Sequence, residues 1–322
     1  MYIAVYLQGG QRFRGKMAYV RVQASADITI INMKNGSDLV SLPEVIRHNR
    51  ELLVNPLFWT SRQLNALRCH FQHIDYVPVE DANIDQMTRQ RTDDTPNPKR
   101  KKEMEEVELF SIATLPNQRI RFLSRLLLNE RSVFNKYQKG ADLFFAGGAV
   151  HQPSYIMFCC HVQTAQSPSQ DFRPLVGYID YLQIDSSRRR RLLPHPHPDK
   201  EKTNDVCQRV SDIKVARATP QEWTEDPYLL CVLISIAQFQ ERTQKASQLT
   251  SQTSHLLVTN GQDKDFIHLY EGQFTTEFLR MLDEPTTARN PTNAPTINRR
   301  KIPYKPFETF VDRIQPKAQD TG

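Results

Sequence analysis

The sequence predicts an α+β protein with a mixed or antiparallel sheet and helices, interrupted by disordered linkers. Runs rich in β-branched and aromatic residues occur in irregular order with segments of helical periodicity, without the regular strand and helix repeat of parallel sheets. The 322 residues are 39% apolar and 24% charged, which is enough apolar content to form a core. Polar stretches without periodicity separate the ordered parts.

Residues 1–78 are predicted to form a small α+β N-terminal region. Three β-favouring runs favour an antiparallel meander, and they cover residues 2–7, 17–23 and 27–33. Two short helices follow, because Ser41 is a capping residue for the first and apolar residues at helical spacing predict the second over 61–74. The charged, aperiodic stretch 79–106 then predicts a disordered linker.

The main α+β domain is expected to span residues 107–314, followed by a frayed tail at 315–322. Its expected elements are a strand at 107–115, a helix at 117–138, strands at 154–162 and 175–184, a helix at 226–248, a hairpin at 254–274 and a short helix at 275–285. A polar insertion at about 186–210 interrupts this order. Asp226 and Pro227 predict a helix start, since they supply a capping carboxylate and a proline at the first helical position.

Two short runs concentrate the positive charge of the chain, whose formal net charge is +6. The runs are Lys99, Arg100, Lys101, Lys102 and Arg188, Arg189, Arg190, Arg191. The first is a nuclear-targeting candidate, because an import receptor can bind clustered cations. The second is a candidate for phosphate contacts along a nucleic-acid backbone, where neutralised phosphates release counterions. No DNA-binding or RNA-binding motif surrounds the arginines, so recognition of a specific nucleic-acid sequence is not predicted. The first run is also explained as a solvated charge cluster.

The predicted hairpin at 254–274 raises the question whether it carries chemistry. Glu271 and Gln273 resemble the second acidic element of a metal-dependent nuclease, in which two carboxylates share a Mg²⁺ ion and a third polar group orients water. Candidates for the first element are Asp180, Asp185, Asp263 and Asp265. Asp263 and Asp265 lie in the loop of the hairpin, too close in sequence to Glu271 to stand across from it on a separate strand. Because a motif this short arises by chance, a structural hairpin is the favoured interpretation.

Two groups of cysteine and histidine could supply zinc ligands. They are Cys69, His70 and His73, together with Cys159, Cys160 and His161. Structural zinc sites show paired Cys-x2-Cys spacing, which this sequence lacks, so buried reduced cysteines are the favoured interpretation and no metal or cofactor is predicted. The sequence contains no nucleophile elbow or phosphate-binding glycine loop, and we assign no catalytic residue. The stretch 145–150 indicates a turn between strands.

Three C-terminal segments carry a resemblance to known proteins. They read DPYLLCVLISIAQFQ, HLLVTNGQDKDFIHLYEGQFTTEFLRMLDEP and KIPYKPFETFVDRI, within residues 225–314. This region resembles the C-terminal region of a lineage-restricted family of filamentous-fungal proteins that carry no assigned activity. The resemblance rests on aromatic and apolar positions, so it implies a fungal origin and a shared fold and supplies no site residue. The N-terminal half departs from it.

These observations favour a non-enzymatic intracellular protein of fungal type that acts through macromolecular contacts, in the nucleus or the cytoplasm. We expect a protein or a nucleic-acid backbone as the partner, and no membrane. The longest apolar run, 228–237, is half as long as a membrane helix, which needs about twenty residues. Two alternatives stay open: an accessory protein of a fungal secondary-metabolic pathway, and a metal-dependent nuclease-like fold.

Overall fold

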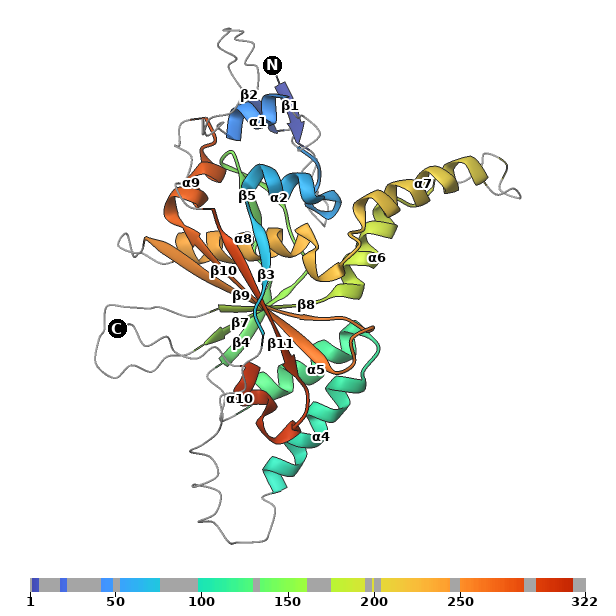
Figure 1. Ribbon diagram of the computed structural model, residues 1–322, viewed down its shortest axis with the longest axis vertical. Coiled ribbons are helices and arrows are strands. Elements are labelled where there is room, and N and C mark those ends of the chain that lie inside the picture. The colour runs from blue at the N-terminus through green and yellow to red at the C-terminus, as the bar shows by residue number, and fades with distance from the viewer. Residues whose placement is uncertain are drawn as a thin grey trace.

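The structure is a computed structural model, which describes residues 2–5, 18–21, 42–48, 53–75, 98–129, 134–160, 175–194, 199, 204–243, 250–286 and 294–314. A seven-stranded mixed sheet with the order β3-β11-β10-β9-β8-β7-β4 forms its centre, which confirms the α+β class (Figure 1). The strands are β3 (His70–His73), β4 (Phe134–Lys139), β7 (Ile156–Cys160), β8 (Leu175–Asp180), β9 (Ser251–Thr259), β10 (Phe266–Thr275) and β11 (Thr296–Pro303).

The sheet combines two antiparallel parts joined by one parallel pair. Strands β4, β7 and β8 pair antiparallel, as do β9, β10 and β11, while β8 and β9 pair in parallel. A parallel pair requires a crossover connection, and helix α8 (Pro227–Thr243) lies within it. Strand β3 pairs in parallel with β11. The predicted boundary at residue 78 therefore separates β3 from the sheet that it joins.

Helix α8 covers one face of the sheet (Figure 1). Its residues from 227 to 238 are all buried, as expected for a helix that is apolar on every side. Helices α1 (Leu42–His48), α2 (Ser61–Leu67) and α9 (Thr276–Asp283) and the short 3-10 helix η2 (Pro56–Phe58) add to this layer. None of the described helices combines the length and the apolarity needed to cross a membrane.

Helices α4 (Pro98–Ile112), α5 (Pro116–Leu127) and α10 (Phe310–Ile314) lie on the other side of the sheet, with the 3-10 helix η4 (Phe307–Thr309) (Figure 1). The strand predicted at 107–115 is wrong, because residues up to 112 are helical. Val107 and Phe110 are buried while Leu109 and Ile112 are exposed, so the apolar run buries one helical stripe.

The remaining elements surround this core. They are β1 (Tyr2–Val5), β2 (Ala18–Arg21), β5 (Leu143–Phe145), β6 (Gly148–His151), α6 (Tyr181–Arg191), α7 (Asp205–Ala218) and η3 (Trp223–Glu225). Strands β5 and β6 form a hairpin, which confirms the turn predicted at 145–150. The predicted helix at 117–138 is wrong in its second half, where β4 forms. The run at 27–33, the linker up to residue 97, residues 244–249 and the tail lie outside the described residues.

The predicted polar insertion at 186–210 contains helical structure at both ends. Helix α6 continues to Arg191, and α7 starts at Asp205. The predicted linker at 79–106 likewise overlaps α4, which begins at Pro98. Proline at the first helical position is favourable, because its missing N–H group would have no partner there. The prediction from sequence therefore missed helical structure in the polar segments 98–106, 186–191 and 205–210.

Candidate functional site

The sheet face opposite α8 is divided into an apolar half, packed under α4, α5 and α10, and a polar half that no described helix covers. We call the polar half the open sheet face. Its residues are Thr253 and His255 on β9, Glu271 and Gln273 on β10, and Thr296, Asn298 and Arg300 on β11. Successive side chains of a strand point to opposite faces, so these positions share one face.

The division occurs within single strands. On β9, Leu257 belongs to the core under α4 and α5, while His255 two residues earlier is on the open sheet face. On β10, Leu269 likewise belongs to the core under α4 and α5, while Glu271 lies on the open sheet face. The alternate positions, such as Leu256 and Tyr270, pack against the α8 layer. The polar pattern of the strands therefore determines where the helical cover stops.

Glu271 lies at the centre of the open sheet face. It is paired in register with His255 on β9 and Asn298 on β11. Its Oε2 atom lies 3.4 Å from His255 Nε2 and 3.4 Å from Arg300 Nη2. The hydrogen bond from His255 lowers the pKa of the half-buried Glu271 carboxyl; burial opposes this, and the charges of His255 and Arg300 add to it. Glu271 is therefore an anion between two basic side chains at neutral pH.

A hollow of about 440 Å³ lies beside Glu271. It is lined by Thr250, Ser251, Glu271, Gln273, Thr275, Ala294, Pro295, Thr296 and Asn298. Gln273 Nε2 donates to Ser251 Oγ at 3.2 Å, and Thr296 Oγ1 lies 3.2 Å from His70 Nε2. The lining offers hydroxyl, amide and carboxylate groups, which can both donate and accept hydrogen bonds. The hollow therefore suits a polar ligand or a polar protein segment.

The structure does not bring Asp180 to Glu271 as a shared metal site would require. Asp180 pairs in register with Thr259, whereas Glu271 pairs with His255, four residues earlier on β9. Four residues span about 13 Å along a strand. Asp180 is also occupied, because its Oδ2 accepts from Arg119 Nη1 at 2.9 Å and from Thr259 Oγ1 at 3.0 Å.

The other candidate carboxylates are also held away from Glu271. Asp185 lies on α6 and accepts from Arg189 at 2.9 Å. Asp263 lies in the β9–β10 loop and is 2.8 Å from His268 Nε2. Asp265 lies in the same loop, directly before β10 begins at Phe266. In the part of the chain that the structure describes, no group of three His, Cys, Asp or Glu side chains could hold a metal ion.

The four arginines at 188–191 do not form one exposed cluster. Arg188 is fully buried, and its Nη2 donates to Asp226 Oδ1 at 2.6 Å. Its Nε donates to the Leu57 carbonyl at 2.7 Å, and Tyr181 donates its hydroxyl to the same Asp226 at 2.9 Å. We call these groups of Arg188, Asp226, Tyr181 and Leu57 the buried junction. It joins α6, η2 and the start of α8, so Arg188 cannot contact a phosphate from there.

A signal for this burial exists in the sequence. Tyr181, Ile184 and Arg188 are spaced three and four residues apart, so they occupy one helical stripe, and all three are buried. Arg189, Arg190 and Arg191 are exposed and are the members of the predicted phosphate-contact run that solvent reaches.

The other predicted cation run, Lys99, Arg100, Lys101 and Lys102, is exposed in the first turns of α4. Cations near a helix N-terminus are unfavourable, because the helix dipole is positive there. The run therefore lies in the first turns of a helix, at a cost in local stability, where a disordered linker was predicted.

The predicted zinc ligands do not converge. Cys69 is buried, and burial raises the pKa of its thiol to about 12. His70 and His73 lie on β3, where residues three apart point to opposite faces, so the helix predicted over 61–74 ends before them. Cys159 is buried on β7, and His161 lies outside the described residues.

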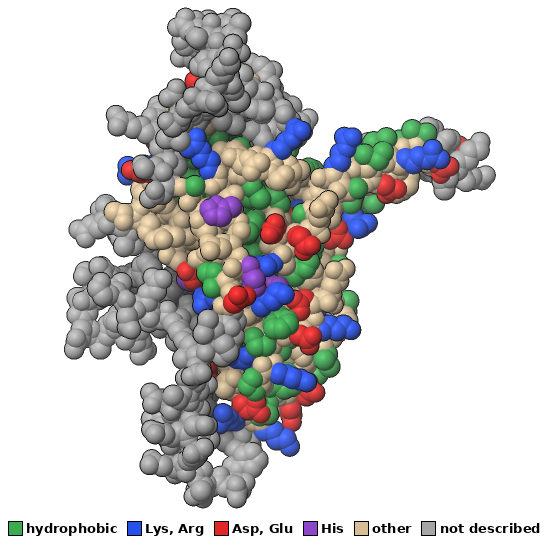
Figure 2. Space-filling view, viewed as in Figure 1, with side chains coloured by type: hydrophobic (Ala, Val, Ile, Leu, Met, Phe, Trp, Pro, Cys, Tyr) green, Lys and Arg blue, Asp and Glu red, His purple; other side chains and the backbone are tan. Residues whose placement is uncertain are grey.

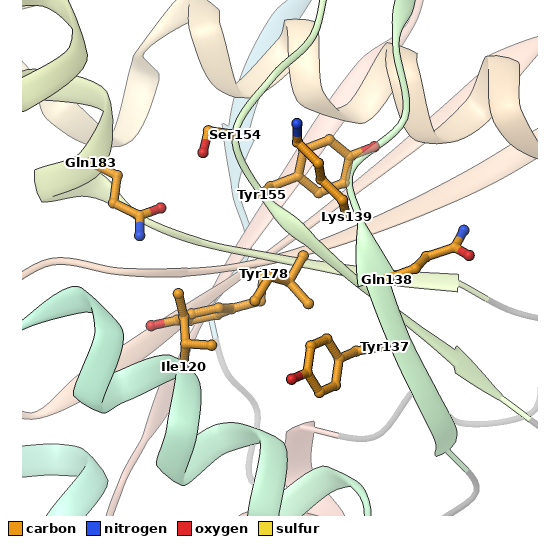
Figure 3. A pocket seen from close by; sticks show the side chains of 9 residues that line it. Ile120, Tyr137, Gln138, Lys139, Ser154, Tyr155, Tyr178 and Gln183 are labelled. Carbon is orange, nitrogen blue, oxygen red and sulfur yellow. The ribbon is translucent and has the colours of Figure 1, made fainter. Parts of the chain in front are cut away.

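A second hollow, of about 260 Å³, lies where β4 and β7 meet α5 and α6 (Figure 3). It is lined by Ile120, Tyr137, Gln138, Lys139, Ser154, Tyr155, Ile156, Tyr178 and Gln183. Lys139 Nζ donates to Gln152 at 2.9 Å, and the Tyr178 hydroxyl lies 2.9 Å from Thr259 Oγ1. Burial raises the pKa of Tyr178, so its phenol stays neutral. This hollow is smaller than the one beside Glu271, and its described lining residues include no charged pair, so it is a weaker candidate than the open sheet face.

Comparison of the chain with known protein families finds no model that matches it, and comparison with curated proteins finds no significant match. The candidate site therefore rests on the geometry of the chain alone.

Proposed function

We propose that this chain is a binding protein that acts through macromolecular contacts, and that the open sheet face is its contact surface. The supporting observation is Glu271, held as an anion between His255 and Arg300 beside a polar hollow of about 440 Å³. A polar sheet face alone would suit simple contact with water. A half-buried charged group with fixed partners on a rigid sheet provides directional recognition as well.

A protein is the partner that this surface favours. The face offers hydroxyls, amides, a carboxylate and a guanidinium in one plane, which can pair with both donors and acceptors of another protein. A nucleic-acid backbone is disfavoured at this surface, because a carboxylate lies at its centre and phosphates require neutralising cations.

Substitution of Gln273 tests the proposal. Gln273→Arg places a long cation on the open sheet face at an exposed position, and Gln118→Arg makes the same change on the exposed side of α5. Each tagged variant is used to capture partners from an extract of cells that express the chain, and the captured proteins are quantified. We expect Gln273→Arg to lose a protein that the wild type and Gln118→Arg both retain. Equal capture by all three would contradict the proposal.

Nuclear import through Lys99, Arg100, Lys101 and Lys102 is a separate proposal. Its support is the exposure of all four side chains in the first turns of α4, where an import receptor can reach them. Fluorescent tagging of the wild type and of a variant with all four changed to Ala tests it. We expect nuclear accumulation of the wild type only, and the same distribution of both proteins would contradict import through this run.

An accessory role in a fungal metabolic pathway stays a prediction. Deletion of the gene, followed by metabolite and transcript profiling under producing conditions, tests it. An unchanged metabolite profile would count against the pathway role and would leave the proposed binding surface unaffected.

A further inference from the structure

Helix α7 leaves the body of the protein as a projecting arm (Figure 1). It is attached along one side, where Ser211 and Ala218 are buried and Ser211 donates its hydroxyl to the carbonyl of Leu192 at the end of α6. Asn204 caps its N-terminus by accepting from the backbone N–H of Cys207. Most other side chains of the helix are exposed.

An apolar stripe runs along the outer side of this arm. Val206, Val210 and Ile213 are 72%, 45% and 52% exposed, and their spacing of four and three residues places them within about 60° of one another around the helix. The attached side, which contains Ser211, lies about 130° away. Figure 2 shows hydrophobic side chains along the arm beside Lys and Arg side chains. The helix therefore has one packed side and, away from it, one exposed apolar side.

The charges of α7 are arranged around the outer stripe. At about 100° per residue, Arg209 and Lys214 flank the stripe on its two sides, and Arg217 falls within it. Asp205 and Asp212 lie on the remaining side of the helix, away from the stripe. The outer face thus combines exposed branched aliphatic side chains with a cationic border.

We propose that the outer face of α7 docks an acidic amphipathic helix of another protein. Isolated helices shorter than about 12–15 residues are marginal in water, and α7 has 14 residues and one attached side, so a partner on its outer side would stabilise it. The four-and-three spacing of Val206, Val210 and Ile213 is the pattern with which helices pair. A cationic border selects a partner with carboxylates beside its own apolar stripe.

Two other occupants are less compatible with these charges. A second copy of α7 would bring cationic borders together, and like charges across an interface are destabilising. An anionic membrane surface would accept the cations, but helices that lie in a membrane surface present Trp, Phe or Leu, and this stripe has two valines and one isoleucine.

The probe for the test is a synthetic 21-residue amphipathic helix with Leu on one face and Glu on both borders of that face. A control peptide carries Lys at the border positions. Binding to the full-length protein is measured by fluorescence anisotropy. We expect the wild type to bind the Glu peptide at least about tenfold more tightly than the Lys peptide, because border charges reverse from attractive to repulsive.

Three variants make the test specific. The double variant Arg209→Glu, Lys214→Glu should reverse the preference and bind the Lys peptide, and Val210→Asp should abolish binding of both peptides. Gln208→Glu is the control, because it adds one negative charge on the opposite side of the same helix. It should bind as the wild type does. Melting temperatures of all variants show whether they remain folded.

Several results would overturn the inference. The inference fails if the wild type does not bind the Glu peptide or binds both peptides equally. It also fails if the folded Val210→Asp variant still binds the Glu peptide. Sedimentation of the wild type with phosphatidylserine vesicles, lost in Val210→Asp, would overturn it in favour of a membrane surface. A dimer of the wild type that becomes a monomer in Val210→Asp would overturn it in favour of a second copy.

The inference shares with the proposed function only the premise that the chain acts through macromolecular contacts, and the two fail separately. Gln273→Arg alters the open sheet face and leaves α7 intact, so this variant should bind the Glu peptide as the wild type does. Loss of peptide binding in Gln273→Arg would show that the arm is not an independent surface and would overturn the inference. Failure of partner capture by the open sheet face leaves the peptide result standing.

Discussion

Two arginine–carboxylate pairs, one in the buried junction and one on the open sheet face, differ in burial and therefore in their role. In the buried junction, Arg188 and Asp226 are both fully buried, and every polar atom described there is bonded to the protein. On the open sheet face, Glu271 is about one quarter exposed and lies at 3.4 Å from Arg300. The same chemistry therefore holds helices together in one place and remains reachable for a partner in the other.

The first prediction concerns a substitution that disrupts the buried junction. Asp226→Asn leaves the Arg188 charge buried without its counter-ion, which should destabilise the protein by about 3–5 kcal/mol. The control is Arg190→Ala, since Arg190 lies on α6 with Arg188 but is exposed. It should change stability by no more than about 0.5 kcal/mol. Urea unfolding measures both. Similar small effects of the two substitutions would show that the pair does not hold α6 against α8.

The second prediction compares neighbouring positions on one face of β9. Leu257→Ala removes a fully buried side chain from under α4 and α5 and should cost about 2–5 kcal/mol. His255→Ala, two residues away on the open sheet face, should cost about 1 kcal/mol or less, because its pair with Glu271 is partly exposed. Urea unfolding of both variants locates the edge of the helical cover. Equal losses would place His255 inside the core.

The sequence predicted the elements that are specified by residues close together in the chain, such as turn and capping residues. The hairpin of β9 and β10 contains a polar turn between two apolar runs, and α8 starts with a capping carboxylate and a proline, so both were predicted. The run around Phe110 was assigned to a strand because it is apolar, whereas the helix is decided by packing against Tyr178 and Tyr304 from distant segments. Strand β3 has one apolar residue and depends on pairing with β11.

The candidate site was predictable only in part. The sequence singled out Glu271 and Gln273 only as candidates for a metal site, and a structural hairpin was the favoured interpretation. Their neighbours His255 and Arg300 come from adjacent strands, and strand register is a long-range property that spacing along the chain does not contain. The outer stripe of α7 has a clear helical spacing, yet its exposure follows from the way α7 attaches to α6.

The third prediction concerns pH and a histidine next to the buried junction. Burial, with a smaller contribution from the charge of Arg191, lowers the pKa of His151 from 6.5 to about 4. The folded protein therefore keeps His151 neutral where the unfolded chain protonates it, so stability should be complete above pH 6.5 and should fall as the pH drops from 6.5 to 4.

The variant His151→Gln removes this titration and should show a smaller loss of stability between pH 7.5 and pH 5. Tyr228→Phe is the control, because it removes the hydroxyl that lies 3.1 Å from His151 and keeps the histidine. Its stability should still fall with pH. Urea unfolding at the two pH values measures the losses, and identical losses in the wild type and His151→Gln would show that folding does not lower the pKa of His151.

The last prediction asks whether the open sheet face binds a metal ion, and the expected effect is the smallest. A ligand that binds only the folded state raises the melting temperature by mass action. Glu271 has two basic neighbours, and Asp180 is held by Arg119 about 13 Å further along the sheet, so no second carboxylate is in place to share Mg²⁺. Added Mg²⁺ or Mn²⁺ should leave the melting temperature of the wild type and of Glu271→Ala unchanged. A metal-dependent rise in the melting temperature of the wild type that disappears in Glu271→Ala would make Glu271 a metal ligand and restore the nuclease-like alternative. Glu271 would then serve to bind a metal ion, and its pairing with Arg300 would no longer support a contact surface for a partner.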